Sequence, residues 1–242
     1  MLILSMDCSA KQVSVSLCDD EKLLGLYFQN NGLTHSRTLL VMIENLLKSL
    51  DLTVNDVDLL AVSNGPGSFT GIRIGVASTI GLAIGAEKKV CGISTLLAMA
   101  YQSQISHIDD KEKLLICPVM DARRDQVYNA LFSLSDDLPI RLCEDRAISL
   151  EDLSVELSSM GKTVYLVGDG ANLTYDFLTF AGIKCTLAPA LMRFQSAYGV
   201  SLASLKAEHI NALDLEPIYL RPSQAERERM SKLNSPESPT AP

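Results

Sequence analysis

Basic residues are in short supply in this chain. Its 242 residues include 21 lysines and arginines against 29 aspartates and glutamates, which gives a formal net charge of −8. A protein that binds nucleic acid unaided usually has a basic face, because neutralising phosphates drives that binding. The composition therefore argues against unaided RNA binding, and an RNA substrate would need a partner protein to supply most of the contacts.

Paired cysteines and a secretion signal are also missing. None of the six cysteines stands in a C-x-x-C pair, and the first residues lack the basic-then-apolar pattern of a signal peptide. Such cysteines are usually small buried side chains in a reducing compartment. The most apolar stretch, residues 69–86, is interrupted by Arg73 and by glycines and is short for a bilayer span. We therefore expect a cytoplasmic protein without disulfides and without membrane association.

Motifs for catalysis and metal binding are scarce. His35, His107 and His209 are far apart and form neither H-x-x-x-H nor H-E-x-x-H, so the sequence gives little support for a metal site. His35 is more typical of a solvated polar residue near a helix start than of a ligand or base. Ser68 lacks the G-x-S-x-G setting of a nucleophile elbow, which disfavours a peptidase.

What the chain does contain is an internal repeat. Residues 6–13 are echoed by residues 120–127, and each copy follows an apolar run and enters an alternating segment. The repeat places Asp7 and Asp121 at equivalent positions, at the ends of two predicted strands. We therefore expect two similar lobes with a cleft between them.

Hydrophobic periodicity predicts the same order of elements in both halves. The first half should contain strands at 1–6, 11–18 and 23–28, a helix at 36–50, a strand at 57–62, a helix at 68–86, a strand at 89–93 and a helix from Ser94. The second should contain strands at 114–120, 125–134 and 138–143, a helix at 149–160, a strand at 163–167, a helix at 171–181 and a strand at 182–187. This order predicts α/β lobes with mixed β-sheets flanked by helices, at 1–110 and 111–221, and a disordered tail at 222–242.

The most unusual segment runs from Asn64 to Gly75, in a region where seven of the 14 glycines lie. It follows an apolar strand and opens a helix, so anion binding at the helix N-terminus is one interpretation. It contains neither G-x-G-x-x-G nor G-K-[ST]. The alternative is a tight turn with a Ser68 N-cap, in which the glycines let the helix approach a neighbour closely. We favour close packing and leave anion binding open.

The cleft is where nucleotide chemistry would take place. Asp7 and Asp121 could hold a hydrated Mg²⁺ or activate water, as in an ATP-dependent kinase or phosphatase. The turns after them contain no glycine, which a backbone that wraps phosphates usually needs. We therefore expect no metal and no cofactor beyond weak ATP or ADP binding at the cleft or a partner interface. The residues of this vestigial pocket would be Asp7, Ser9, Asp121, Gly168 and Gly170, although a plain strand-to-helix turn is the favoured role of the two glycines.

Six segments of the chain carry a family resemblance, of which the glycine-rich one is the strongest marker. They are residues 3–7, 35–40, 65–75, 92–96, 121–123 and 217–221. Residues 1 to about 221 thereby resemble the TsaB (YeaZ) family, the dimerisation subunit of the bacterial tRNA threonylcarbamoyladenosine machinery. The resemblance implies the actin-like, sugar-kinase and Hsp70-like ATPase fold.

The resemblance also implies partners. The catalytic paralogue, TsaD, carries the metal site and transfers a threonylcarbamoyl group to N6 of adenosine 37 in tRNAs that read codons beginning with A. The ATPase TsaE joins these two proteins. The chain would contact tRNA only indirectly, through the complex, and a homodimer is expected when the paralogue is absent. The paralogue has two histidines four residues apart on its first helix, whereas this chain has His35 but Leu39. The resemblance therefore implies a non-catalytic scaffold subunit.

In this family the two helices of the first lobe form the subunit contact, as half of a four-helix bundle. The first of them, 36–50, has an apolar arc wider than a single core requires, although a neighbouring helix of the same chain could cover all of it. We expect the interface residues to be Leu39, Leu40, Ile43, Leu46, Leu47, Gly71, Ile72, Gly75, Val76 and Ile80.

Overall fold

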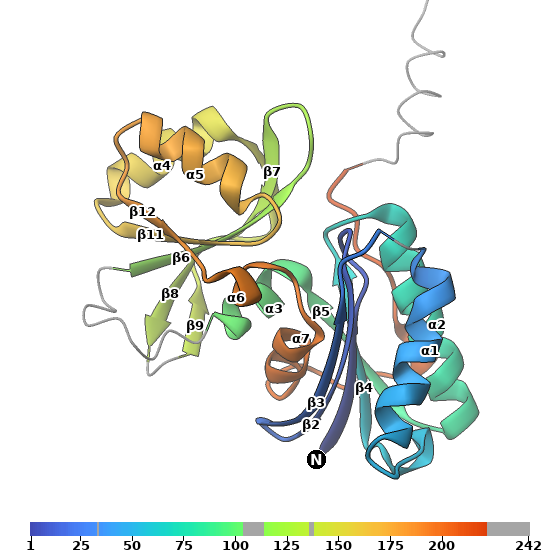
Figure 1. The fold of residues 1–242 in the computed structure, drawn as a ribbon. Coiled ribbons are helices and arrows are strands. Elements are labelled where there is room, and N and C mark those ends of the chain that lie inside the picture. Colours follow the sequence, from blue (N-terminus) through green and yellow to red (C-terminus); the bar gives the residue numbers. More distant parts are fainter. Residues whose placement is uncertain (33, 104–113, 136–137, 222–242) are drawn as a thin grey trace, which may run out of the picture.

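The computed structural model describes all residues except 33, 104–113, 136–137 and 222–242, and the chain folds into two α/β lobes (Figure 1). The tail at 222–242 thus lies outside the described residues. The first lobe contains β1 (Leu2–Asp7), β2 (Val13–Asp19), β3 (Lys22–Gln29), α1 (His35–Lys48), η1 (Val54–Asp56), β4 (Leu59–Gly65), α2 (Phe69–Ala86), β5 (Lys89–Ser94) and α3 (Thr95–Gln102). The remaining elements are β6 (Leu114–Asp121), β7 (Gln126–Asn129), β8 (Phe132–Ser135), β9 (Leu138–Arg141), β10 (Arg146–Ser149), α4 (Leu150–Met160), β11 (Thr163–Val167), α5 (Ala171–Phe180), β12 (Cys185–Leu187), α6 (Ala190–Arg193), α7 (Ala197–Ser204) and η3 (Ala212–Asp214).

The two lobes share one sheet topology, which confirms the predicted duplication. The first sheet has the order β3-β2-β1-β4-β5, and the second has the order β10-β7-β6-β11-β12. In the first sheet β1 pairs antiparallel with β2 and parallel with β4; in the second, β6 pairs antiparallel with β7 and parallel with β11. Asp7 and Asp121 therefore end equivalent central strands, β1 and β6.

The second lobe differs from the prediction in its third strand. The strand expected at 125–134 is two strands, and the expected third strand at 138–143 is instead part of an added hairpin, β8–β9. The side-chain amide of Asn129 donates to the carbonyl oxygens of Pro118 (3.1 Å) and Ala130 (3.0 Å), and β7 ends there. The third position of the sheet is taken by β10, which pairs antiparallel with β7.

Helices cover both faces of the first sheet and separate the two lobes. Helices α1 and α2 lie on the outer face of the first sheet, and α4 and α5 lie on the outer face of the second (Figure 1). Helices α3 and α7 pack against each other between the sheets, with α3 on β6 and α7 on β1 and β2. The outer faces of the two lobes are thus α1–α2 and α4–α5.

The C-terminal part of the chain returns to the first lobe. Helix α7 packs on the first sheet, Ile210 pairs with Val90 of β5, and the Ile218 amide donates to the carbonyl oxygen of Asn64 at 2.7 Å. The predicted division assigns these segments to the second lobe by sequence position, whereas their packing partners belong to the first. We call residues 215–221, which run along the glycine-rich loop, the C-terminal strap.

Candidate functional site

Helix α1 uses one stripe of its surface for the core of its own lobe. Its buried side chains recur three or four residues apart and face the first sheet. They are Leu39, Met42, Ile43, Leu46 and Leu47. Leu40 and Val41, beside this stripe, remain 51% and 52% exposed. The helix therefore has apolar side chains that its own lobe does not cover.

Helix α2 is apolar all round but is covered on one side. The Ser68 Oγ accepts a hydrogen bond from the Gly71 amide (3.3 Å) at its start, and Glu87 ends it in the left-handed conformation (φ 53°). Its buried residues are Gly71, Ile72, Gly75, Val76, Thr79 and Ala83. Among the described residues, α2 is the one helix whose length and composition would suit a membrane span, and 33% of it is buried.

Most of the predicted interface residues lie in the core instead. Eight of the ten are buried against the first lobe's own sheet, namely Leu39, Ile43, Leu46, Leu47, Gly71, Ile72, Gly75 and Val76. These eight have little surface left for a partner, because the strongest periodic stripe of a surface helix marks the side that packs on its own sheet; their place in an interface stays a prediction. Leu40 is exposed and Ile80 is half-buried, so both remain candidates.

The candidate partner face consists of residues that the sequence reasoning mostly missed. Besides Leu40 and Ile80, it comprises Val41, Arg73, Ala77, Gly81 and Ile84. A Cβ added at Gly81 or Gly85 would meet no atom within 4 Å, so the lobe's own packing does not require these glycines. The signal was present in the sequence, since most of these residues are apolar or small positions outside the buried stripes.

The glycine-rich loop owes its composition to close backbone packing. A Cβ at Gly67 would lie 2.2 Å from the Ser9 carbonyl oxygen, and one at Gly71 would lie 2.0 Å from that of Cys8. A Cβ at Gly65 would meet the Ile218 carbonyl oxygen at 2.1 Å. The Ser68 amide is already used, since it donates to the Ser9 oxygen at 2.6 Å. These contacts support the close-packing interpretation over a phosphate cradle.

Asp7 and Asp121 have the same local hydrogen bonding but different exposure. Asp7 Oδ1 accepts from the Ser9 amide at 3.0 Å, and Asp121 Oδ1 accepts from the Arg123 amide at 2.7 Å. Asp121 is exposed, whereas Asp7 is 1% exposed and its Oδ2 has no hydrogen-bond partner among the described residues. Burial raises the pKa of Asp7 because the charged carboxylate loses its water.

A third acid, Asp169, links the two lobes. Its carboxylate accepts from Gln195 Nε2 at 2.8 Å, and the Gln195 Oε1 accepts from Gln12 Nε2 of the first lobe. Burial raises the pKa of Asp169, and the charges of Asp121 and Asp7 raise it further. The three carboxyl groups of Asp7, Asp121 and Asp169 are therefore close enough for their charges to interact.

Gly168 and Gly170 form a strand-to-helix turn. A Cβ at Gly168 would lie 2.0 Å from the Val119 carbonyl oxygen, and one at Gly170 would lie 2.9 Å from the Asp121 nitrogen. Their amides donate to the carbonyl oxygens of Arg193 (2.6 Å) and Val119 (3.1 Å). Because both amides are occupied, this turn offers them to no nucleotide, and the favoured structural role of the two glycines fits the geometry.

Ser68 and His35 have structural contacts. The Ser68 oxygen caps α2, and the His35 Nε2 lies 3.2 Å from the Lys11 carbonyl oxygen. Within the described parts of the chain, no group of three or more His, Cys, Asp or Glu side chains is placed to hold a metal ion. These contacts give Ser68 a capping role and provide no support for a nucleophile.

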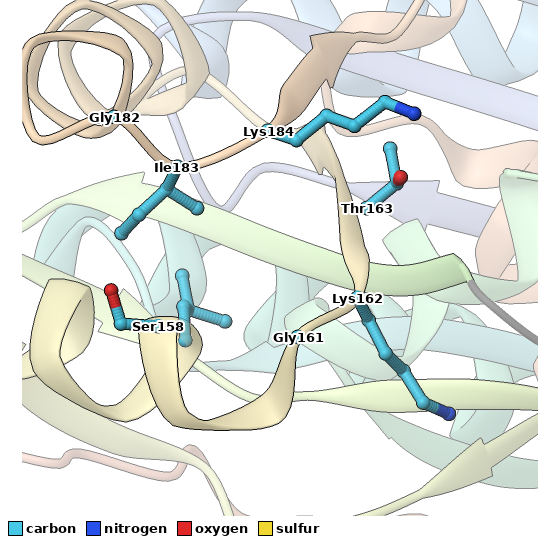
Figure 2. Close-up of a pocket in the computed structure, with 8 residues that line it drawn as sticks. Ser158, Gly161, Lys162, Thr163, Gly182, Ile183 and Lys184 are labelled. Carbon is cyan, nitrogen blue, oxygen red and sulfur yellow. The ribbon is translucent and has the colours of Figure 1, made fainter.

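A pocket lies in the second lobe, beside the C-terminal ends of α4 and α5 (Figure 2). Lys162 and Lys184 border it, and Leu157 and Ile183 contribute apolar surface. It contains none of the residues predicted from the sequence. Helix C-termini carry partial negative charge, so the lysines are balanced locally and the pocket has no clear preference for anions.

Comparisons with known proteins agree with one another. Residues 30–234 match the family model described as TsaD: tRNA N6-adenosine threonylcarbamoyltransferase. The tRNA threonylcarbamoyladenosine biosynthesis protein TsaB of Haemophilus influenzae is 30% identical over 91% of this chain and 94% of its own length. The TsaB protein of Bacillus subtilis is 27% identical over 93% of this chain and 96% of its own length.

The fold agrees with solved structures as well. A crystal structure of a Pseudomonas aeruginosa protein with similarity to the peptidase YeaZ covers 91% of this chain and 99% of its own, with a TM-score of 0.76 and 24% identity. YeaZ from the same organism gives a TM-score of 0.72. Together with the duplicated sheet topology, this confirms the predicted actin-like, two-lobed fold. The chain belongs to the TsaB (YeaZ) family of tRNA threonylcarbamoyladenosine biosynthesis proteins, within the wider group that the TsaD model describes.

Proposed function

We propose that this chain is a non-catalytic dimerisation subunit of the complex that attaches threonylcarbamoyl to N6 of adenosine 37 in tRNA. It acts by binding a TsaD-like catalytic paralogue through the outer face of α1 and α2. The family membership supports the pathway, and the uncovered apolar face supports the mode of action.

The main observation that supports this interface is the incomplete burial of α2. In this 18-residue apolar helix 33% of the residues are buried. Its Ile84, like Leu40 and Val41 of the neighbouring helix α1, is about half exposed. Covering each of these three side chains with a partner would contribute about 1 kcal/mol from apolar burial. Gly81 and Gly85 would let a partner helix approach closely. A partner helix pair therefore suits this face.

The non-catalytic part of the proposal is supported by Leu39. This residue stands where the resemblance places a histidine in the catalytic paralogue, and it is 1% exposed in the core beneath α1. A core leucine cannot ligate a metal, and its side chain points into the sheet packing rather than into the cleft. His35 alone does not replace the missing pair.

The remaining partners follow from charge and family. With a net charge of −8, the chain would meet tRNA only through the complex. A TsaE-like ATPase would join the complex, and the same α1–α2 face would form a homodimer when the paralogue is absent. Such a protein would work in the cytoplasm, and the partner rather than a membrane would cover α2.

The interface is tested by an aspartate in the last turn of α2. Ile84→Asp places a charge on the uncovered side of α2 and should weaken binding to the purified paralogue about 100-fold. Val155→Asp is the matched control, since Val155 is an apolar residue that is 69% exposed on α4, on the outer face of the other lobe. Calorimetry of both variants would oppose the proposed face if Ile84→Asp bound normally or if both variants lost binding equally.

A second candidate function is supported by the paired aspartates at the ends of β1 and β6. An ATP-dependent kinase or phosphatase could use Asp7 and Asp121. Calorimetry with ATP and Mg²⁺ separates the two functions, because tight binding that is lost in Asp7→Ala would favour the enzyme. The burial of Asp7, which is 1% exposed, favours the scaffold, since a hydrated Mg²⁺ needs an accessible carboxylate.

A further inference from the structure

Arg73 is the one charged residue of helix α2. It is exposed and lies on the same side of the helix as Ala77 and Gly81, four and eight residues later. The proposed partner face therefore ends in a single cation. The close packing of the glycine-rich loop does not explain this charge.

The guanidinium group of Arg73 is held in one orientation. Its Nε donates to the Tyr219 hydroxyl at 2.8 Å, and its Cζ lies 5.4 Å from the centre of the Tyr219 ring. That ring stacks on Phe69, one turn earlier on α2, with centroids 4.5 Å apart and planes 13° apart. The Arg73 Cζ lies 6.0 Å from the Phe69 ring centre. One donor and two aromatic faces thus restrict an otherwise mobile side chain.

Tyr219 is itself fixed by the C-terminal strap. The strap is bound to Asn64 through both backbone and side chain. The Ile218 amide donates to the Asn64 carbonyl oxygen at 2.7 Å, and the Asn64 Nδ2 donates to the Glu216 carbonyl oxygen at 3.0 Å. Two residues after Tyr219, Arg221 donates to the Ala122 oxygen at 3.0 Å. The backbone contacts of the strap therefore hold Tyr219 in place, and Tyr219 in turn orients Arg73.

Both terminal nitrogens of Arg73 have no hydrogen-bond partner, and no acid forms an ion pair with it, within the described residues. If a partner covers α2, this guanidinium loses water, and an uncompensated buried charge costs several kcal/mol. The partner must therefore supply an acceptor. A carboxylate fits the two free N–H groups in the bidentate geometry that arginine favours.

We propose that Arg73 is a specificity residue that binds an aspartate or glutamate carboxylate of the catalytic paralogue. This proposal rests on the proposed function above. A second copy of this chain suits the position less well, because helices α1 and α2 carry one acid between them. That acid, Glu44, already accepts from Lys48 at 2.5 Å. Arg73 thereby distinguishes the paralogue from a self-contact on the same face.

The test compares binding of the purified paralogue with self-association of the chain. Arg73→Gln should weaken the paralogue complex about 30-fold or more, because it leaves the partner's carboxylate unpaired, and should leave self-association unchanged. Arg73→Lys should bind the paralogue more tightly than Arg73→Gln but less tightly than the parent chain. Lysine keeps the positive charge but lacks the paired N–H donors of the guanidinium group. Tyr219→Phe keeps the ring stack, removes the orienting hydroxyl and should weaken binding by a smaller factor. Lys184→Gln, on the other lobe, is the control for loss of one positive charge.

Each outcome decides between the two proposals. Normal paralogue binding by Arg73→Gln, with binding lost in Ile84→Asp, would overturn the role of Arg73 and keep the interface. Normal binding by both would overturn the interface itself. Equal weakening of self-association by Arg73→Gln would overturn the assignment to the paralogue. A charge swap would identify the acceptor. If Arg73→Glu abolishes binding and a paralogue variant with arginine in place of one carboxylate residue restores it, that residue is the partner of Arg73.

Discussion

At the scale of single residues, sequence reasoning placed the acids of the cleft but not the contacts of the partner face. Asp7 and Asp121 were located because a repeat carries their positions from one lobe to the other. Leu39 and Ile72, predicted at the interface, are buried in the chain's own core, because periodicity reports which side of a helix is apolar without telling the chain's own sheet from a partner. Arg73 could not be assigned from sequence, since its partner Tyr219 lies 146 positions away.

Asp7 gives a prediction for the pH dependence of stability. Burial raises its pKa above the unfolded value, so the folded state holds a proton that the unfolded state releases. Stability should therefore fall as pH rises from the unfolded pKa of about 4 through the folded pKa. Asp7→Asn keeps an acceptor for Ser9 without a titrating proton and should raise the melting temperature at pH 7.

Thermal unfolding of both proteins between pH 4 and pH 8 measures this difference. The gain from Asp7→Asn should shrink toward pH 4, because the unfolded carboxyl also takes up protons as the pH approaches its pKa. A variant that melts below the parent protein at pH 7, or a difference that does not change with pH, would show that the Asp7 carboxylate is stabilising.

At the scale of elements, hydrophobic pattern predicts the strands and helices of the first lobe. In the second lobe the same pattern does not predict every strand. An alternating run at 125–134 predicts one strand, but the side chain of Asn129 bonds to nearby backbone oxygens and the run divides into β7 and β8. The return of α7 to the first sheet is a long-range packing choice that local periodicity does not encode. The glycine-rich start of α2, in contrast, was correctly interpreted as close packing.

Two glycines of α2 provide a matched test of that packing. Gly71→Ala would place its Cβ 2.0 Å from the Cys8 carbonyl oxygen, which is backbone and cannot rotate away, so it should destabilise the chain by about 1–3 kcal/mol. Gly81→Ala has open space and should stabilise the helix by up to about 1 kcal/mol. Denaturant unfolding of the two variants should move the midpoint in opposite directions. Equal shifts would contradict the close approach of α2 to the β1–β2 turn.

At the scale of the whole molecule, the actin-like frame is retained while its cleft and outer face have different properties. The cleft holds three acids, a buried unpaired oxygen of Asp7 and turns whose amides are occupied. The outer face of the first lobe holds a long apolar helix that the chain itself leaves exposed on one side. Such a division suits a protein that contributes a surface to a complex, and the acidic net charge suits one that leaves tRNA binding to others.

The most direct test of this account is a drop-out assay of threonylcarbamoyl transfer to tRNA. Purified paralogue and TsaE-like ATPase would be assayed with the chain, without it, and with the Ile84→Asp variant, alongside the chain alone. The account predicts transfer with the intact chain, loss of transfer without it or with Ile84→Asp, and no transfer by the chain alone. Full transfer in its absence would contradict the scaffold function.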